Sequence, residues 1–382
     1  GVVIALTWWG AGDVVDSTAA GASYGYALMW TMTLAVLIRS VVTYLIGKYT
    51  IVTGETIIEG FKRISRILLY LLLIATIYYL HMYGAFLLKA SAAGIWEIAE
   101  RAGGDIGLFV IALVLSILSL IIFYRVMGRE WYKYIEYIFK ALAAIAGAVL
   151  VAILVFNTLR NPLAIPMMLI NAINFLYLPP GVGPWEASFL AVGAIGAIGG
   201  SITNLFYSYF VREKGWRGSE GVRSAIYDIT FALIFLLILN LALWTLGAEI
   251  LRPQGIHVTS IADIAYGTGY VFGSFGYYIM LLGFFVAAYT SYIGCAIGLS
   301  LLGVNIIHVL KPERRNIYTE LTKDPIFTVL LIFGLVPPVI WSLPGMPGVV
   351  WLIIFGNATN VFAVPIIAIG VFILVTSKRY IG

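Results

Sequence analysis

Charged residues are scarce in this sequence of 382 residues. Lys, Arg, Asp and Glu make up 11% of it, whereas soluble domains carry about 25%. Hydrophobic residues make up 62%, and the mean hydropathy is +1.00. This composition excludes an ordinary soluble domain. It predicts an integral membrane protein whose main surroundings are the lipid bilayer.

Cysteine and histidine are almost missing as well. One cysteine, Cys295, and three histidines leave no disulfide framework and no thiolate metal cluster. The sequence also lacks an HExxH pattern, a Gly-rich phosphate loop and a Ser–His pairing near a common face. The net charge of +5 does not indicate a nucleic-acid partner, because the basic residues are spread over alternate loops. We therefore expect no enzyme, no resident cofactor and no nucleic-acid partner.

Long apolar runs are what the sequence has instead. Most are about 20 residues or longer, the length that a helix needs to cross about 30 Å of hydrocarbon, so helices are favoured over barrel strands. The runs predict an all-α membrane protein, one transmembrane domain over 1–382. Ten spans are expected near 1–22, 25–47, 65–89, 106–125, 138–158, 187–211, 224–249, 275–302, 325–343 and 348–376.

Basic residues divide unequally between the two sides of these spans. One side collects all but five of the 23; the exceptions are Lys89, Arg101, Arg160 and Arg252 on the other side, and Arg39 within a span. By the positive-inside rule the richer side is cytoplasmic, and both chain ends are predicted to lie there in a multi-pass protein of the cell membrane. The chain opens at Gly1 within the first span, so we expect residues before it.

Two spans are interrupted by glycines and polar residues, at 10–13 in the first and at 197–204 in the sixth. Such a pair predicts broken helices, whose free backbone groups can replace the water shell of a solute at mid-membrane. Breaks at the first and sixth of ten spans imply two five-helix repeats of opposite orientation, about 1–158 and 187–376. The alternative is a coincidental pair of glycines at ordinary helix–helix contacts.

The two longest loops, near 159–186 and 250–274, are predicted to be extracellular. The first is too apolar for a free loop and is expected to hold an interfacial or re-entrant piece. The second ends in glycines and tyrosines at 266–270, which suit either a lid or an anchor at the membrane interface, and the anchor is favoured because Tyr gathers at headgroup level.

Several segments closely resemble the Nramp family of divalent metal transporters. The likeness runs in register through nearly the whole chain, at 13–30, 51–55, 204–208 and 376–382. The resemblance implies a LeuT-like 5+5 inverted-repeat fold with helices 1 and 6 broken. It also implies proton-linked or passive uptake of a divalent metal ion, the transported substrate, at a site between those helices.

The metal motifs of the family are altered in this sequence. Where the family's first helix reads Asp-Pro-Gly-Asn, the aligned stretch from Gly10 to Asp13 keeps a carboxylate only at its end. Where the sixth helix reads Met-Pro-His, the aligned stretch from Ser201 to Thr203 has lost the thioether. Oxygen ligands without sulfur point to a harder cation such as Mg²⁺ or Mn²⁺.

A set of oxygen-bearing residues at the breaks and on the tenth helix is predicted to surround the metal. They are Asp13, the carbonyls of Gly10 and Gly200, Ser201, Thr203 and Asn357. The alternative for Asp13 is to cap the second half of the broken helix. The alternative for Asn357, and for Asn360 beyond it, is hydrogen bonding between helices.

Proton coupling is expected to be weak or absent. The family's third helix carries an Asp and a Glu, and the aligned residues here are Tyr78 and His81. His81 could still titrate near neutral pH, or it could be a packing residue held by a hydrogen bond. Arg39 aligns with a family Gln and could pair with a carboxylate such as Asp16 or repel cations from a vestibule. These four residues are the candidates for a proton path or for gating.

A second function with the same fold remains open, the transport of a non-metal organic solute. A cation site should keep Asp13 unpaired by any Lys or Arg, whereas a site for an organic carboxylate would favour Arg39 close by. The pattern gives no indication of an oligomeric state.

Overall fold

The structure, a computed structural model, describes residues 9–126 and 130–377. Within these residues the chain is all helical, and its single β-contact is an isolated bridge between Val182 and Trp185. The predicted all-α class is therefore confirmed. The helices are α2 (Ala11–Tyr24), α3 (Met29–Thr53), α4 (Ile57–Ile64), α5 (Arg66–Ile98), α6 (Gly104–Ile121), α7 (Glu130–Arg160), α8 (Ala164–Ala172), α9 (Ala187–Ile198), α10 (Phe206–Glu213), α11 (Gly218–Thr245), α12 (Ile261–Leu310), α13 (Pro312–Ile317), α14 (Pro325–Leu335), α15 (Val349–Ala358) and α16 (Asn360–Thr376).

Eight of the ten predicted spans coincide with helical segments that are long and apolar enough to cross a membrane. The fifth corresponds to α7, whose described part is bent by 105° against α8. The first corresponds to α2 and the residues before it, of which 1–8 lie outside the described part of the chain. The sixth span is divided into α9 and α10, as predicted. In the first span α2 begins only at Ala11, after the extended Gly10, as the predicted break requires.

The sequence-based boundaries were wrong in two places. α5 continues to Ile98, so Lys89 is buried within the helix and not in a loop. α12 begins at Ile261, so most of the predicted loop at 250–274 is helical. Gly273 has non-helical backbone angles (φ +60°, ψ −152°) and forms a kink that joins two helical parts of α12. The apolar piece predicted at 159–186 is the helix α8.

Local signals in the sequence explain where several helices start. Thr56 caps α4, and the Glu59 carboxylate accepts a hydrogen bond from the Thr56 N–H. Ser260 and Asp263 form the same arrangement at α12. Asp324 caps α14, whose first residue is Pro325, a position where a missing N–H costs nothing.

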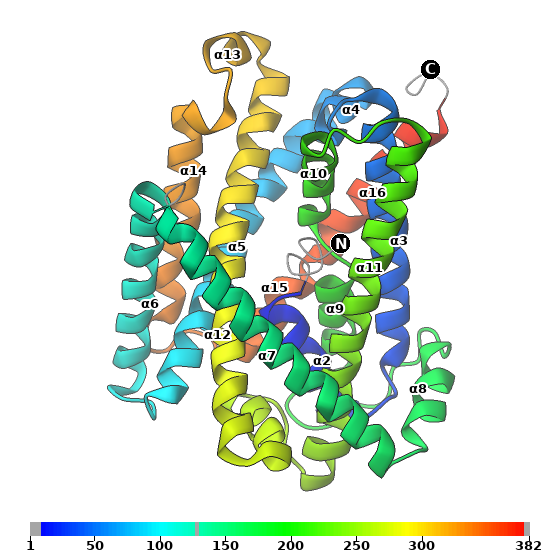
Figure 1. Cartoon of the computed structure of the whole chain (residues 1–382), viewed down its shortest axis with the longest axis vertical. Coiled ribbons are helices and arrows are strands. Elements are labelled where there is room, and N and C mark those ends of the chain that lie inside the picture. The colour runs from blue at the N-terminus through cyan, green and yellow to red at the C-terminus, as the bar shows by residue number, and fades with distance from the viewer. Residues whose placement is uncertain (1–8, 127–129, 378–382) are drawn as a thin grey trace.

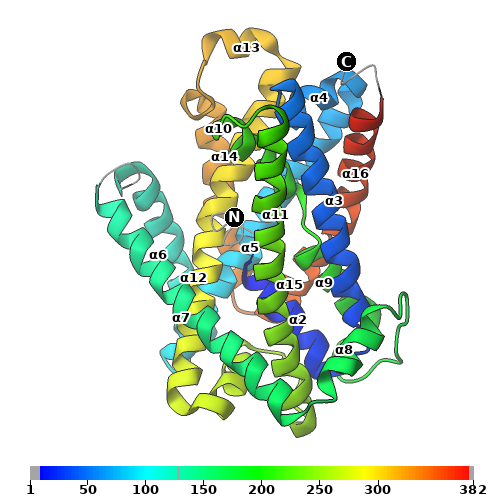
Figure 2. The same cartoon turned by 45° about the vertical axis from the view of Figure 1, so that its right-hand side comes forward.

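The helices form one bundle in which α2 and α9 are enclosed (Figure 1). α2 packs against α9, α11, α12 and α15, and α9 also packs against α3. At one end of the bundle α4, α10 and α13 lie together with the end of α16, and both views show this grouping (Figure 2). We call it the basic end, because it carries Arg212, Arg314 and Arg315. α8 and the start of α12 lie at the opposite end (Figure 1).

Candidate functional site

The two helix breaks expose backbone groups in the enclosed part of the bundle. Gly10 is extended (φ −145°, ψ −174°) and precedes the first turn of α2. α9 ends at Ile198, Gly200 adopts φ +85°, and Ser201 is again extended before a short 3₁₀ turn leads into α10. Glycine suits position 200, because residues with a side chain rarely adopt a positive φ of this size. The positive end of α2 and the negative end of α9 therefore both point into the bundle.

Asp13 lies at the first break, as predicted, and its carboxylate is held by neutral donors. Oδ2 accepts the Gly10 N–H at 3.1 Å, which makes Asp13 a capping residue of α2. Oδ1 accepts a hydrogen bond from Nδ2 of Asn240, a residue of α11, at 3.1 Å. Asn240 in turn accepts the Ser17 hydroxyl at 2.6 Å. The capping alternative is thus realised, and it surrounds the carboxylate with the dipoles of neutral donors.

Asp16 lies one turn further along α2 and is fully buried. Its Oδ2 accepts Nδ2 of Asn357 from α15 at 2.6 Å, whereas Oδ1 has no hydrogen-bond partner among the described residues. α9 packs closely against Asp16 of α2, because a Cβ on Gly193 would lie 2.4 Å from Asp16 Oδ1. A Cβ on Gly12 would lie 2.5 Å from Asn357 Nδ2. Asn357 is therefore an interhelical bridge with its amide oriented toward Asp16.

Arg39 reaches the same region from α3. It is 3% exposed, and its Nη2 donates to the main-chain oxygen of Ala197 at 3.3 Å, in the last turn of α9. Its positive charge also attracts Asp13. The sequence suggested a carboxylate partner such as Asp16; here Asp16 is bound by Asn357, and the charge of Arg39 acts on Asp13.

The remaining predicted ligands line the second break. The hydroxyls of Ser201 and Thr203 are 2.9 Å apart, and Ser201 also caps the turn that starts α10. Near this break the hydroxyl of Tyr83 from α5 donates to Asn360 Oδ1 at 2.8 Å. The Gly10 carbonyl accepts the Val14 N–H at a long 3.4 Å. The Gly200 backbone is covered by the side chain of Asn204.

Two of the candidates for a proton path, Tyr78 and His81, do not lie with the polar residues at the two breaks. Tyr78 is 41% exposed on the outside of α5. His81 accepts Nε1–H of Trp341 at 3.0 Å and packs against Phe333, which corresponds to the packing alternative. Lys89, two turns along α5, donates to the main-chain oxygens of Trp341 and Pro347. This face of α5 therefore holds the segment between α14 and α15.

Sequence reasoning missed Asn240 and Tyr83. Asn240 stands in an otherwise apolar run of α11, and a polar side chain at membrane depth is itself a signal of function. Tyr83 was hidden among the many aromatic residues of α5, where no local pattern distinguishes it from packing residues.

Oxygen atoms dominate the chemistry that this region offers. Two carboxylates, three hydroxyls and the carbonyl end of α9 converge near the breaks. Among the described residues no group of three or more His, Cys, Asp or Glu side chains could hold a metal ion together. A cation here would therefore rely mainly on neutral oxygens, with Asp13 and Asp16 supplying the charge.

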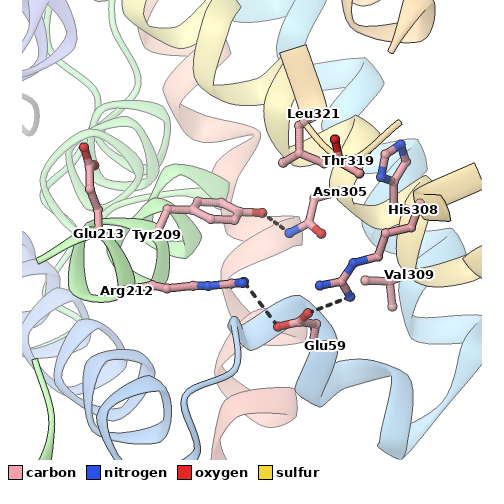
Figure 3. Close-up of a pocket in the computed structure, with 10 residues that line it drawn as sticks. Glu59, Tyr209, Arg212, Glu213, Asn305, His308, Val309, Thr319 and Leu321 are labelled. Atoms are coloured by element: carbon pink, nitrogen blue, oxygen red, sulfur yellow. Dashed lines mark hydrogen bonds and ion pairs between the residues drawn. The ribbon is translucent and has the colours of Figure 1, made fainter. Parts of the chain in front are cut away.

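A second polar region lies at the basic end and surrounds a cavity of about 520 Å³ (Figure 3). Glu59 of α4 forms an ion pair with Arg212 of α10, whose Nη1 lies 3.7 Å from Oε2. It also accepts a hydrogen bond from Nη1 of Arg315 of α13 at 3.2 Å. Asn305 of α12 donates to the Tyr209 hydroxyl of α10 at 2.7 Å. These contacts join the second half of the broken sixth helix to its neighbours.

Asp324 forms the other strong contact at the basic end. Arg314 binds both of its carboxylate oxygens at 2.7 Å, and His308 Nε2 lies 2.8 Å from Oδ2. Hydrogen bonds from the Arg314 guanidinium, more than any other group, hold the pKa of Asp324 well below its ordinary value of 3.8. The carboxylates at the helix breaks thus accept hydrogen bonds from amides, whereas those at the basic end accept them from arginines.

Comparison with known proteins gives a consistent result. The family described as natural resistance-associated macrophage protein-like (Nramp) matches residues 1–382. The divalent metal cation transporter MntH of Xanthomonas campestris pv. campestris is 26% identical over 265 residues, which are 67% of this chain and 56% of that relative's length.

Solved structures of the Eremococcus coleocola manganese transporter share the fold. A histidine-to-alanine variant superposes with a TM-score of 0.71 at 15% identity, covering 100% of this chain and 79% of the other. Its complex with an aromatic bis-isothiourea substituted compound gives a TM-score of 0.60 at 14% identity, covering 98% and 84%. The likeness confirms the predicted LeuT-like architecture with its broken first and sixth helices.

Proposed function

This chain belongs to the Nramp family, and we propose that it carries a divalent metal cation across the cell membrane through the region between the two helix breaks. The family consists of metal transporters and not of enzymes. We further propose that both chain ends face the cytoplasm, since the basic end should lie there by the positive-inside rule.

The observation that carries the proposal is the oxygen-only chemistry at the two breaks. Asp13 supplies charge at the first break, and Ser201 and Thr203 supply hydroxyls at the second. Neither break contains a thioether or an imidazole. Hard oxygen donors favour Mg²⁺ or Mn²⁺ over softer metals, so we propose a preference for these two ions. Tight binding of Cd²⁺ or Fe²⁺ by purified protein that ignores Mg²⁺ and Mn²⁺ would overturn the preference.

Uptake into liposomes tests the role of Asp13. Asp13→Asn keeps the shape and the capping bond but removes the charge. At an effective dielectric constant of about 20, a unit charge pair at about 4 Å is worth about 4 kcal/mol, so we expect uptake of Mg²⁺ and Mn²⁺ to fall more than about ten-fold. Asp228→Asn is the matched control, because Asp228 is a buried aspartate paired with Lys214 near the basic end. Equal loss in both variants would contradict a special role for Asp13.

We also propose that transport is not coupled to protons. His81 is held by Trp341, and Tyr78 is a phenol on the outside of α5, so neither offers a carboxylate relay. A pH-sensitive dye inside the liposomes should report no acidification during metal uptake. A proton flux that matches the metal flux would refute this.

A second candidate function is the transport of an organic carboxylate. The observation that favours it is Arg39, whose guanidinium lies at the breaks and could bind a carboxylate. Saturable uptake of amino or organic acids, with no uptake of any divalent ion by folded protein, would establish it in place of metal transport.

A further inference from the structure

Arg39 is a permanently charged side chain enclosed at membrane depth. It lies near the middle of α3, a helix of 25 residues, and only 3% of it is exposed. Ala35, one turn earlier, fixes the position of the helix, because a Cβ on Gly199 would lie 3.3 Å from Ala35 Cα. α3 therefore abuts the second break directly. A charge in this position requires compensation from its neighbours.

The groups that compensate Arg39 come from both breaks. The Ala197 oxygen that accepts its Nη2 belongs to the last turn of α9, which carries the negative end of the helix dipole. Asp13, whose charge attracts Arg39, starts α2. A small cation bound between broken helices would use the same two kinds of group, a carbonyl end and a carboxylate. The guanidinium thus uses the negative groups that a transported cation needs.

Charge balance sets these two cations against each other. Asp13 and Asp16 can bring at most two negative charges, and Arg39 brings one positive charge. A divalent ion beside Arg39 would meet strong repulsion, because like charges are poorly screened in a low-dielectric interior. The long, flexible stem of arginine allows its head to withdraw while the helix stays in place.

We propose that Arg39 determines the affinity and specificity of the site as its built-in cation: an incoming divalent metal displaces its guanidinium from the end of α9 and takes over the attraction to Asp13. The inference rests on the proposed transport of a divalent cation. Between transport events the guanidinium would supply the positive charge that the metal supplies when it is bound. It also weakens metal binding, so that the ion can leave again.

Binding of Mn²⁺ to the purified protein, measured by calorimetry, tests this role. Arg39→Gln removes the charge but retains a donor for the Ala197 oxygen, and we expect it to bind Mn²⁺ at least about ten-fold more tightly than wild type. Arg39→Lys keeps the charge and should stay within about three-fold of wild type. A purely structural arginine would give the opposite direction, with weaker binding and a lower melting temperature in Arg39→Gln.

Chemical competition gives a second readout that survives poor folding of one variant. In Arg39→Ala, guanidinium ion at non-denaturing concentration should weaken Mn²⁺ binding by occupying the vacated place. In wild type it should have no such effect. Absence of competition in Arg39→Ala would overturn the proposal.

The outcomes separate the inference from the proposed function. Wild type that binds Mn²⁺, with Arg39→Gln binding no more tightly, overturns the role of Arg39 alone. Folded wild type and variants that bind neither Mn²⁺ nor Mg²⁺ overturn both the role of Arg39 and the metal transport on which it rests.

Discussion

Carboxylates in the centre of this molecule and carboxylates at its basic end are compensated in different ways. Asp13 and Asp16 accept hydrogen bonds from asparagine side chains, and the charge of Arg39 acts on Asp13 from the end of α9. Glu59 and Asp324 accept hydrogen bonds directly from arginines. In our proposal the central carboxylates are therefore the ones that a cation can reach by displacing a single arginine. The donors of an acidic residue, and not its position alone, decide whether it can act as a ligand.

The largest expected effect comes from removing an amide of the central region. Asn240→Leu takes a donor from Asp13 and an acceptor from Ser17, so we expect a loss of about 2 kcal/mol in the free energy of unfolding. Thermal unfolding in detergent measures it. Asn157→Leu in α7 is the matched control, since its buried amide has no hydrogen-bond partner among the described residues. If both variants lose the same stability, the hydrogen bonds of Asn240 are not the cause.

A smaller effect is expected from Asp324 at the basic end. Asp324→Asn loses the charge that Arg314 binds, and we expect a cost of about 1 kcal/mol, because Arg314 is partly exposed to solvent. The effect should depend on pH. The pKa of Asp324 is lowered in the folded state, so its contribution is fully present above its ordinary pKa of 3.8 and decreases as the pH falls below it.

Melting temperatures of wild type and Asp324→Asn between pH 3 and pH 7 check this sign. Their difference should be constant at the upper end and shrink below about pH 4. A difference that grows on acidification would mean that the folded state does not lower the pKa of Asp324.

The smallest effect on stability is expected from Glu59, whose arginine partners are 48% and 56% exposed. Glu59→Gln should change the free energy of unfolding by less than about 1 kcal/mol. It should nevertheless loosen α10 from α4. Cys295 lies on the face of α12 between Ser291, which meets Gly10, and Gly298, which meets Phe206 at the start of α10. Alkylation of this single thiol should therefore become faster.

Glu320→Gln is the control for this experiment, because Glu320 pairs with Lys323 one turn away and both side chains are well exposed. It should leave the alkylation rate unchanged. If Glu59→Gln also leaves it unchanged, the contacts around the cavity do not restrict access to Cys295.

Local patterns were sufficient to predict the helices, the two breaks and the position of Asp13. Apolar runs and glycines act over a few residues, and their physical consequences are equally local. The partners of Asp13 are different in kind, because Asn240 is 227 residues away in sequence. No spacing rule connects them, and only the packing of α11 on α2 brings them together.

The role of Arg39 could not be predicted from local sequence patterns either. Its sequence position predicted a buried charge, but two roles were compatible with it, an ion pair or the repulsion of cations. Which one applies depends on where the last turn of α9 ends, a property of tertiary structure. The boundary of α12 was missed for a simpler reason, since Tyr and Gly at 266–270 favour loops locally and packing against the bundle overrides that preference.

The interruption at Gly273 has a consequence for how the protein sits in its membrane. A straight helix of 50 residues would be about 75 Å long, more than twice the hydrocarbon thickness of a bilayer. The interruption divides α12 into a long part that can cross and a short part that starts at Ile261. Tyrosines from both sides of Gly273 surround a hollow there. Because tyrosine favours the headgroup level, we expect bilayers of unmatched acyl-chain length to strain this corner of the molecule first.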